Sequence, residues 1–437
     1  MSADFETIAL RDITPASRNA RTHSKKQIRQ IAKSIRQFGF TNPVLVDERT
    51  VLIAGHGRLE AARLLGLTTV PAIRVTHLSA EEKRALMLAD NKIAENAGWD
   101  LEILATELAD LSEAVLDFDL EITAFEIGEI DVILRDHSST TEAAPETAPI
   151  PDDGVHAITR RGDLWHLDRH RVLCGDARDV LDYAALMGDK KASMGITDPP
   201  YNVPIAGHVC GNGRVQHREF VEASGEMSPD TFEAFLTQAL QLGATYSEDG
   251  AVWFAFMDWR HLGEMHRAGT TAFDAMINLC VWAKTNAGMG SLYRSQHELV
   301  LVFRKGRKQH RNNVQLGKFG RHRSNLWTYP GVNTFRPGRM TELEAHPTPK
   351  PVALIREAIL DVSKRGDIVL DPFLGGGATV IAAEEVGRVA YGLEIDPLYV
   401  DVILRRWRVE TGREPVRASD GWTLGALERE AGQEGGE

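Results

Sequence analysis

The stretch Met194-Gly195-Ile196-Thr197-Asp198-Pro199-Pro200-Tyr201 decides the fold class of most of this 437-residue chain. Its first four residues form a short apolar run, which predicts a buried strand that ends at an acid. Two consecutive prolines hold the following backbone extended and remove two amide donors, so nearby carbonyl oxygens stay free to accept. With an acid before them and an aromatic ring after them, the prolines predict a compact pocket rather than a plain turn.

A second strand end of this kind follows later in the chain. Residues 368–370 are apolar and end at Asp371, and the glycine-rich turn Pro372-Phe373-Leu374-Gly375-Gly376-Gly377 leads into a predicted helix. Glycines at a strand-to-helix turn let the backbone approach a ligand closely. The next predicted strand ends at Glu394, 19 residues after Gly375, where dinucleotide-binding folds place the carboxylate that bonds ribose hydroxyls. Because Val380 replaces the third glycine of the dinucleotide fingerprint, a different adenosyl ligand is expected.

Strands and helices alternate over residues 154–415, which predicts an α/β doubly wound sheet. This region resembles the amino-methyltransferase family of DNA methyltransferases, which methylate adenine N6 or cytosine N4 with S-adenosyl-L-methionine. Residues 198–201 match the family's catalytic motif in full. The cofactor motif keeps Thr379 but has Gly376 for a serine and Ala378 for a threonine. Since the catalytic motif comes first, the resemblance implies the permuted beta order and a Rossmann-like methyltransferase sheet.

The resemblance also implies which residues form the site. The catalytic residues would be Asp198, Pro199, Pro200 and Tyr201. The Asp198 carboxylate and the Pro199 carbonyl would accept hydrogen bonds from the amino group, and Tyr201 would stack on the flipped base. The residues expected to bind S-adenosyl-L-methionine are Asp176, Asp198, Lys350, Asp371, Phe373, Gly375, Gly377, Thr379 and Glu394. No metal is expected, because the three cysteines lack the spacing of a zinc site.

Charge is distributed unevenly along the chain. The net charge is −12, yet residues 301–340 hold ten Lys or Arg, no Asp or Glu, and several aromatic residues. A local basic segment can bind phosphates on an acidic protein, because salt limits the reach of distant charges to about 10 Å. This segment is therefore the expected target-recognition region, with a solvated basic loop as the alternative. The residues expected to contact DNA are Arg304, Lys305, Arg307, Lys308, Arg321, Arg323 and Arg336.

Residues 1–135 predict a small α+β domain with trailing acidic helices, and residues 136–153 a flexible linker. Arg18-Asn19-Ala20-Arg21 and Gly55-His56-Gly57-Arg58 resemble the ParB N-terminal/sulfiredoxin fold. Gly57 and Glu60 replace two arginines of the ParB loop, which removes charge that would pair with nucleotide phosphates, so a bound nucleotide is left open. Sulfiredoxin chemistry is excluded because the first cysteine is Cys174. Residues 1–80 carry a net +6, so we expect an accessory domain that engages DNA.

Two further segments lie near predicted strand ends. His297 and Glu298 would point to opposite faces of a strand, so joint metal binding is not expected and a structural or DNA-facing role is preferred. Asp258-Trp259-Arg260 either lines the cleft or forms a surface loop. Residues 416–437, rich in glycine and glutamate, are expected to form a flexible tail.

The leading hypothesis is a site-specific adenine-N6 methyltransferase acting on double-stranded DNA. Asp at the first position of the catalytic motif favours adenine within the family. The alternatives are a cytosine-N4 methyltransferase, a ParB-like DNA-binding protein with an inactive methyltransferase fold, and an enzyme that acts on RNA. A homodimer and a companion restriction-modification endonuclease are left open. The sequence has no run of 18 apolar residues and no secretory signal at its start, so a cytoplasmic protein without membrane contact is expected.

Overall fold

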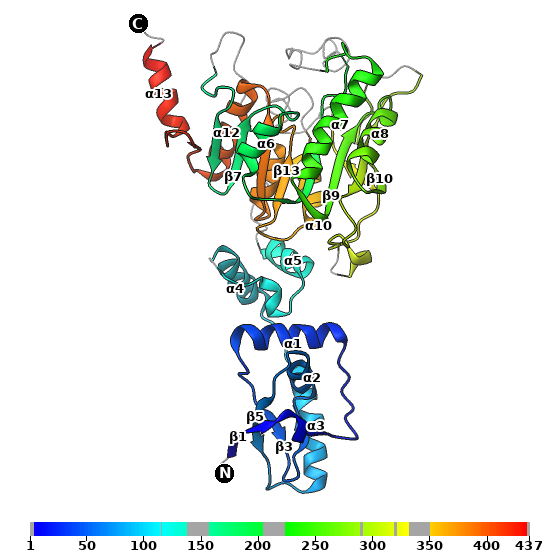
Figure 1. Cartoon of the computed structure of the whole chain (residues 1–437), viewed down its shortest axis with the longest axis vertical. Coiled ribbons are helices and arrows are strands. Elements are labelled where there is room, and N and C mark those ends of the chain that lie inside the picture. The colour runs from blue at the N-terminus through cyan, green and yellow to red at the C-terminus, as the bar shows by residue number, and fades with distance from the viewer. Residues whose placement is uncertain are drawn as a thin grey trace. The chain divides into compact units, whose positions relative to one another are not determined.

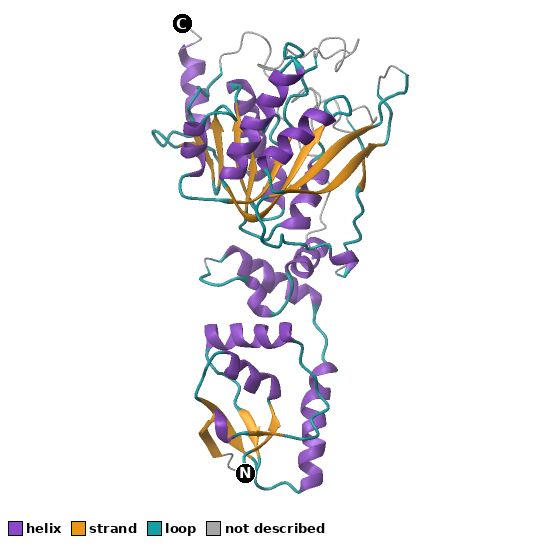
Figure 2. Cartoon of the chain, turned by 45° about the vertical axis from the view of Figure 1, so that its right-hand side comes forward, coloured by secondary structure: helices purple, strands orange, loops and turns teal. Residues whose placement is uncertain are grey.

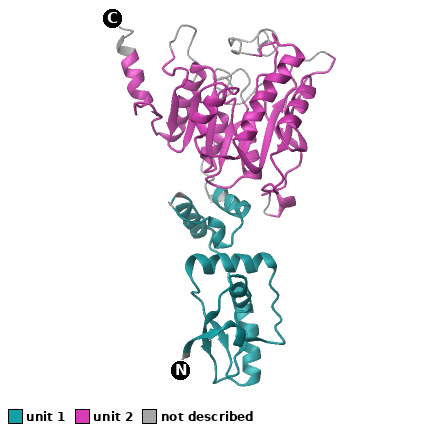
Figure 3. Ribbon diagram, viewed as in Figure 1, with its two compact units in different colours: residues 1–139 teal, residues 140–437 magenta. Residues whose placement is uncertain are grey.

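The computed structural model describes residues 4–114, 116–137, 157–203, 223–288, 292–318, 321–331 and 350–434. The chain divides into two compact units, Met1–Ser139 and Thr140–Glu437 (Figure 3). The boundary falls within the expected linker, most of which lies outside the described residues. None of the described helices is both long enough and apolar enough to cross a membrane.

Unit 1 is built on a small mixed sheet with the strand order β1-β5-β3-β4-β2 (Figure 1). Its elements are β1 (Asp4–Ala9), β2 (Thr14–Pro15), α1 (Lys25–Phe38), β3 (Val44–Val46), β4 (Val51–Ala54), α2 (His56–Leu64), β5 (Thr69–Arg74), α3 (Ala80–Glu95), α4 (Leu101–Glu113) and α5 (Ile127–His137). The Ser24 side chain caps the first turn of α1. The left-handed Gly55 (φ 96°) starts α2, where a Cβ would lie 2.9 Å from Val44. The expected small α+β domain with trailing helices is confirmed.

Unit 2 contains one ten-stranded sheet with the order β12-β10-β11-β9-β8-β13-β14-β7-β6-β15. Its strands are β6 (Leu164–Leu167), β7 (His170–Cys174), β8 (Ala192–Thr197), β9 (Ser247–Met257), β10 (Ala275–Lys284), β11 (His297–Arg304), β12 (Leu326–Tyr329), β13 (Ile368–Asp371), β14 (Val389–Glu394) and β15 (Val416–Arg417). Its helices are α6 (Val180–Met187), α7 (Pro229–Thr245), α8 (Leu262–Ala272), α10 (Val352–Val362), α11 (Ala378–Glu385), α12 (Pro397–Thr411) and α13 (Leu424–Glu434).

The central strands of this sheet are parallel, and helices cover both of its faces (Figure 2). One core contains side chains of α10, α11 and α12, and the other contains side chains of α6, α7 and α8. Alternate residues of β9 enter the two cores: Phe254 faces the first and Trp253 the second. Gly195 and Gly243 make room for the Trp253 ring, since a Cβ at Gly195 would lie 2.2 Å from it. The expected doubly wound fold is confirmed.

The chain order places the two sequence motifs on adjacent strands. β8 and β13 pair in parallel, with Val369 opposite Met194, although they are far apart in sequence. Parallel strands that are neighbours end at the same edge of the sheet, so the residues after β8 and β13 meet there. In open α/β sheets, ligands bind at this carboxyl edge.

The C-terminal segment differs from the expected flexible tail. β15 pairs with β6, and α13 packs on the sheet through Leu424, which is fully buried. Glu428 of α13 forms ion pairs with Arg405 and Arg408 of α12. The prediction was wrong for residues 416–434, because one buried leucine and a pair of ion pairs fix a segment whose overall composition is that of a loop.

Candidate active site

A pocket lies at the carboxyl edge of the sheet and contains most of the residues that the sequence singled out. The predicted residues that line it are Asp176, Asp198, Pro199, Pro200, Tyr201, Lys350, Asp371, Phe373, Gly375, Thr379 and Glu394. Gly377 does not line it. That residue adopts a left-handed conformation (φ 76°) at the start of α11, where a Cβ would lie 2.9 Å from Ile403. Its role in the structure is therefore to let the turn pack closely on α12.

Asp371 organises the glycine-rich turn. Its carboxylate accepts hydrogen bonds from the backbone amide of Phe373 at 3.0 Å and from the hydroxyl of Thr379 at 2.6 Å. Burial raises the pKa of Asp371 to about 7. Thr379, the threonine that the chain keeps from the family motif, thus holds the turn in shape through its hydroxyl. Gly376 and Ala378 have no hydroxyl with which to do so.

Glu394 fastens the same turn from the end of β14. One of its carboxylate oxygens accepts from the amide of Gly375 and the other from the amide of Asp396, both at 2.9 Å. Asp176, at the end of β7, accepts from the Arg178 guanidinium at 2.8 Å. Although burial opposes it, this pairing lowers the pKa of Asp176. Carboxylates at the ends of β7, β13 and β14 therefore surround one side of the pocket.

Two aromatic rings complete this side. Phe373 follows β13 and Phe235 belongs to α7, and their ring centroids are 5.9 Å apart. Both rings line the pocket together with the carboxylates and the glycine turn. An apolar slot beside hydroxyl-accepting carboxylates fits the adenosyl part of S-adenosyl-L-methionine. The sequence did not single out Phe235, because it lies on a helix whose other apolar residues enter the core.

Asp198 lies on the opposite side, immediately after β8. One of its oxygens accepts from the Lys350 ammonium at 2.5 Å, and the other accepts from the Tyr201 hydroxyl at 2.7 Å. Burial raises the pKa of Asp198, although the nearby lysine opposes that change. Lys350 was expected to bind the cofactor, and the structure places its ammonium on the Asp198 carboxylate.

Glu298 joins this group from β11, and sequence reasoning missed its place there. Its carboxylate accepts from the Lys284 ammonium at 2.6 Å and lies 3.2 Å from the Lys350 ammonium. The Tyr201 hydroxyl lies 3.1 Å from the same carboxylate. The two acids and two lysines have formal charges that cancel, which is the condition for keeping them buried. Although burial opposes it, the lysines lower the pKa of Glu298 to about 2.

Strand direction explains why Glu298 reaches the site. β11 runs antiparallel to β9, with Leu299 opposite Met257, so its first residues lie at the carboxyl edge of the parallel strands. The same geometry sends the end of β11 to the far edge, where Arg304 pairs with Val252. At about 3.3 Å per residue, the five steps along β9 from Phe256 back to Ala251 span about 17 Å.

The basic residues predicted to contact DNA therefore do not border this pocket. Arg304, Lys305, Arg307 and Lys308 follow β11 to the edge opposite Asp198. The expectation used charge alone and not the direction of the strand that carries these residues, and their contact with DNA stays a prediction. Arg336 lies outside the described residues.

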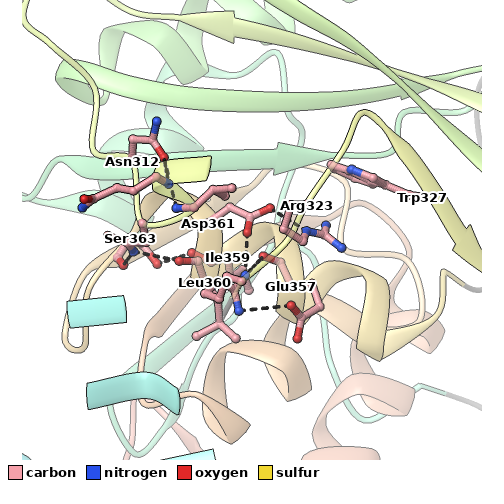
Figure 4. A network of polar contacts seen from close by, with 12 residues as sticks. Asn312, Arg323, Trp327, Glu357, Ile359, Leu360, Asp361 and Ser363 are labelled. Carbon is pink, nitrogen blue, oxygen red and sulfur yellow. Dashed lines mark hydrogen bonds and ion pairs between the residues drawn. The ribbon is translucent and has the colours of Figure 1, made fainter. Parts of the chain in front are cut away.

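Arg321 and Arg323 also differ from the expected DNA contacts. Figure 4 shows the network in which Arg323 meets Asp361 of α10. The buried Arg321 forms ion pairs with Asp361 at 2.5 Å and with Glu357 at 3.1 Å. Arg323 also donates to the Tyr329 hydroxyl and lies over the Trp327 ring. These two arginines fasten residues 321–329 to α10, and their side chains are only 3% and 15% exposed.

Models of known protein families match segments of both units. A family model described as DNA methylase, of the N6/N4 methyltransferases, matches residues 192–405. The ParB N-terminal domain matches residues 2–92, and a ParB-methyltransferase HTH domain matches residues 102–161. The chain contains an N6/N4 DNA methylase domain and, ahead of it, a ParB N-terminal domain. The helix-turn-helix match covers α4 and α5, which the sequence identified only as acidic helices.

Individual relatives cover different parts of the chain. The ParB-like nuclease domain-containing protein YnaK of Escherichia coli (strain K12) is 49% identical over 75 residues, which are 17% of this chain and 86% of that protein. The type II methyltransferase M.HpaI of Haemophilus parainfluenzae is 23% identical over 250 residues, 54% of this chain and 73% of that protein. The DNA adenine methyltransferase YhdJ of Escherichia coli (strain K12) is 45% identical over 82 residues, 19% of this chain and 26% of that protein. A solved complex of M1.HpyAVI with SAM is 20% identical, with a TM-score of 0.40, over 54% of this chain and 97% of that one.

Proposed function

We propose that this chain transfers the methyl group of S-adenosyl-L-methionine to the N6 amino group of a flipped adenine in double-stranded DNA. The observation that carries the proposal is that Asp198 and Tyr201 share one pocket with Asp371 and Glu394. An acceptor for an amino group and a set of groups suited to an adenosyl ligand thus face the same space.

The cofactor side of the pocket has the groups that the ligand needs. Glu394 is placed to accept from ribose hydroxyls, as the carboxylate at this strand end does in related sheets. Phe235 and Phe373 would flank the adenine ring, and the glycine-rich turn would let the chain of the cofactor pass close to the backbone. When bound there, S-adenosyl-L-methionine supplies a sulfonium methyl group that accepts the nitrogen lone pair as the carbon–sulfur bond breaks.

The residues of the chain prepare the nitrogen for that transfer. The amino lone pair is delocalised into the ring of the base, so the free amine is a poor nucleophile. Hydrogen bonds from the amino group to Asp198 and to the Pro199 carbonyl would concentrate electron density on the nitrogen. Tyr201 would stack on the flipped base, which contributes about 1–3 kcal/mol. One proton leaves the nitrogen by way of the Asp198 carboxylate to solvent, and the pKa of that acid is already raised by burial.

Adenine is proposed over cytosine on two grounds. Asp at the first motif position favours adenine in this family, and the segment similar to YhdJ is similar to a protein named as a DNA adenine methyltransferase. Cytosine N4 is the alternative, since both bases present an exocyclic amino group to the same acceptors. The related protein M.HpaI is named as a type II methyltransferase. We therefore propose a restriction-modification system as the setting in which to search for the recognised sequence.

The test is methyl transfer from labelled S-adenosyl-L-methionine to unmethylated DNA, followed by nucleoside analysis. Wild type is expected to place label in N6-methyladenine, and Asp198→Ala to lose at least about 10²-fold in rate, as when one transition-state hydrogen bond is removed. Asp189→Ala, which changes an exposed aspartate outside the pocket, is the matched control. Label in N4-methylcytosine would replace the adenine assignment, and bound cofactor without transfer to DNA would favour RNA or a DNA-binding protein without methylase chemistry.

A further inference from the structure

Tyr201 has one hydroxyl hydrogen and two carboxylates within its reach. The hydroxyl oxygen lies 2.7 Å from Asp198 and 3.1 Å from Glu298. A phenol can donate to only one acceptor at a time. The hydroxyl therefore has two arrangements that differ by a rotation about its carbon–oxygen bond and leave the ring in place.

The two carboxylates differ in what holds them. Glu298 has a second tether, because Lys284 donates to its other oxygen at 2.6 Å, and its side chain is only 12% exposed. Asp198 and Tyr201 line the pocket, whereas Glu298 does not. Asp198 is thus the acid that an incoming amino group meets, and Glu298 is the fixed acid behind it.

Lys350 links the same two acids. Its ammonium lies 2.5 Å from Asp198 and 3.2 Å from Glu298. Three aromatic rings surround the ammonium at 5.4–5.9 Å from their centroids, those of Tyr201, Phe256 and Trp282. A cation so enclosed is held by charge as well as by the ring faces, so removing either acid changes how the other is placed.

We infer that Glu298 is a positioning residue for methyl transfer: it accepts the Tyr201 hydroxyl hydrogen when the target amino group donates to Asp198, and it holds Lys350 beside that acid. The inference rests on the proposed function and names a residue outside the Asp198–Tyr201 motif on which that motif depends. The ring of Tyr201 stays where it can stack, because only the hydroxyl hydrogen moves. No bond other than hydrogen bonds is formed or broken in this step.

A double-mutant cycle in the full-length chain tests the inference. The variants are Glu298→Gln, Tyr201→Phe and the two combined, each measured for kcat on unmethylated DNA and for S-adenosyl-L-methionine affinity by calorimetry. Glu298→Gln is expected to lower kcat by about 10–100-fold and cofactor affinity by less than about threefold. In the Tyr201→Phe background the same change should cost clearly less in kcat, because the hydroxyl contact is already absent and only the contact of Glu298 with Lys350 remains to be lost.

The pH profile gives a readout that a merely structural role would not move. Asp198 faces Lys350, Tyr201 and Glu298, and it also senses Asp371. The negative charge of Glu298 raises the pKa of Asp198, so Glu298→Gln should shift the acid limb of the rate to lower pH. The matched control is Glu384→Gln, which removes a hydrogen-bonded glutamate on α11 outside the pocket.

The outcomes separate the inference from the function. A wild-type chain that neither binds the cofactor nor methylates DNA overturns both. An active wild type with equal Glu298→Gln losses in both backgrounds and an unmoved acid limb overturns the inference alone. Glu298→Gln could also lower cofactor affinity, kcat and thermal midpoint together, by as much as Glu384→Gln does. That result would mean that Glu298 only stabilises the fold, and it would overturn the inference.

Discussion

Glu384 shows how one side chain fixes several segments of unit 2. Its carboxylate accepts from His170 Nε2 at 2.7 Å, from Trp407 Nε1 at 3.1 Å and from Arg413. The other His170 nitrogen accepts from the amide of Ala390 at 2.8 Å, so Nε2 carries the hydrogen. Although burial opposes it, the hydrogen bonds from His170 and Trp407 lower the pKa of Glu384 to about 2. One acid thus joins β7, α11, α12 and β14.

We expect Glu384→Gln to destabilise unit 2 in a pH-dependent way. Because the folded pKa lies below the ordinary value of 4.5, the ionised acid stabilises the fold above pH 4.5, and this contribution is lost between pH 4.5 and about 2. The loss at pH 7 should be about 3 kcal/mol and should be mostly gone near pH 2, measured by denaturant unfolding. Glu385→Gln is the control, since burial raises the pKa of Glu385 and its removal should not destabilise at pH 7. Equal losses at both pH values would contradict the prediction.

At the scale of elements, two loops at the carboxyl edge of the sheet carry exposed aromatic side chains. Trp259 follows β9 and is 53% exposed, with the Arg260 guanidinium 4.9 Å from its ring centroid. Tyr293 lies between β10 and β11 and is 83% exposed. Exposed rings next to a cation are typical of surfaces that stack on nucleic-acid bases.

These loops should contribute to DNA binding, whereas the basic turn after β11 should not. Tyr293→Ala and Arg260→Ala are each expected to weaken binding by about 1 kcal/mol or more, close to tenfold, without changing the thermal midpoint. Lys308→Ala, at the opposite edge, is the matched control and should leave affinity within about twofold. Fluorescence anisotropy with a duplex at fixed salt measures all three. A larger effect at Lys308 than at either rim residue would reverse the assignment of the edges.

Whether a contact could be predicted from the sequence depends on how strands and side chains far apart in the chain pair with one another. Asp198 and Asp371 could be predicted to meet, because each ends an apolar run of a parallel sheet and carries a motif with few alternatives. The network around Lys350 could not, since it depends on β11 being antiparallel to β9 and on the start of β11 lying at the carboxyl edge. The expectation that Arg321 contacts DNA missed its ion pairs for a related reason. A basic stretch cannot reveal that Asp361, 40 residues away, buries and neutralises one of its members.

At the scale of the whole molecule, each of the two units carries a net charge of −6, and basic residues are concentrated locally. Although the net charge of the chain is −12, the helix α1 contains five Lys or Arg and no acid. Its basic residues are all exposed, while Ala32 on the other face is buried. Lys26 forms an ion pair with Glu126, and the exposed side chains that recur along the helix are Lys25, Arg29 and Lys33. Such a row matches the spacing at which one helix face meets a phosphate backbone.

We expect this row to supply a non-specific share of DNA affinity to the full-length chain. Each phosphate that a cation neutralises contributes about 0.9 to the slope of log affinity against log salt. Replacing Lys25, Arg29 and Lys33 together with glutamine should therefore reduce the slope by about 2–3 and leave kcat at saturating DNA unchanged, because the methylase pocket is untouched. The pair Arg307→Gln and Lys308→Gln, which removes charge from the far edge of unit 2, should leave the slope nearly as it is. An unaltered slope in the triple variant would mean that the ParB-like unit does not hold DNA through α1, and a fall in kcat at saturating DNA would mean that it acts on the reaction as well as on binding.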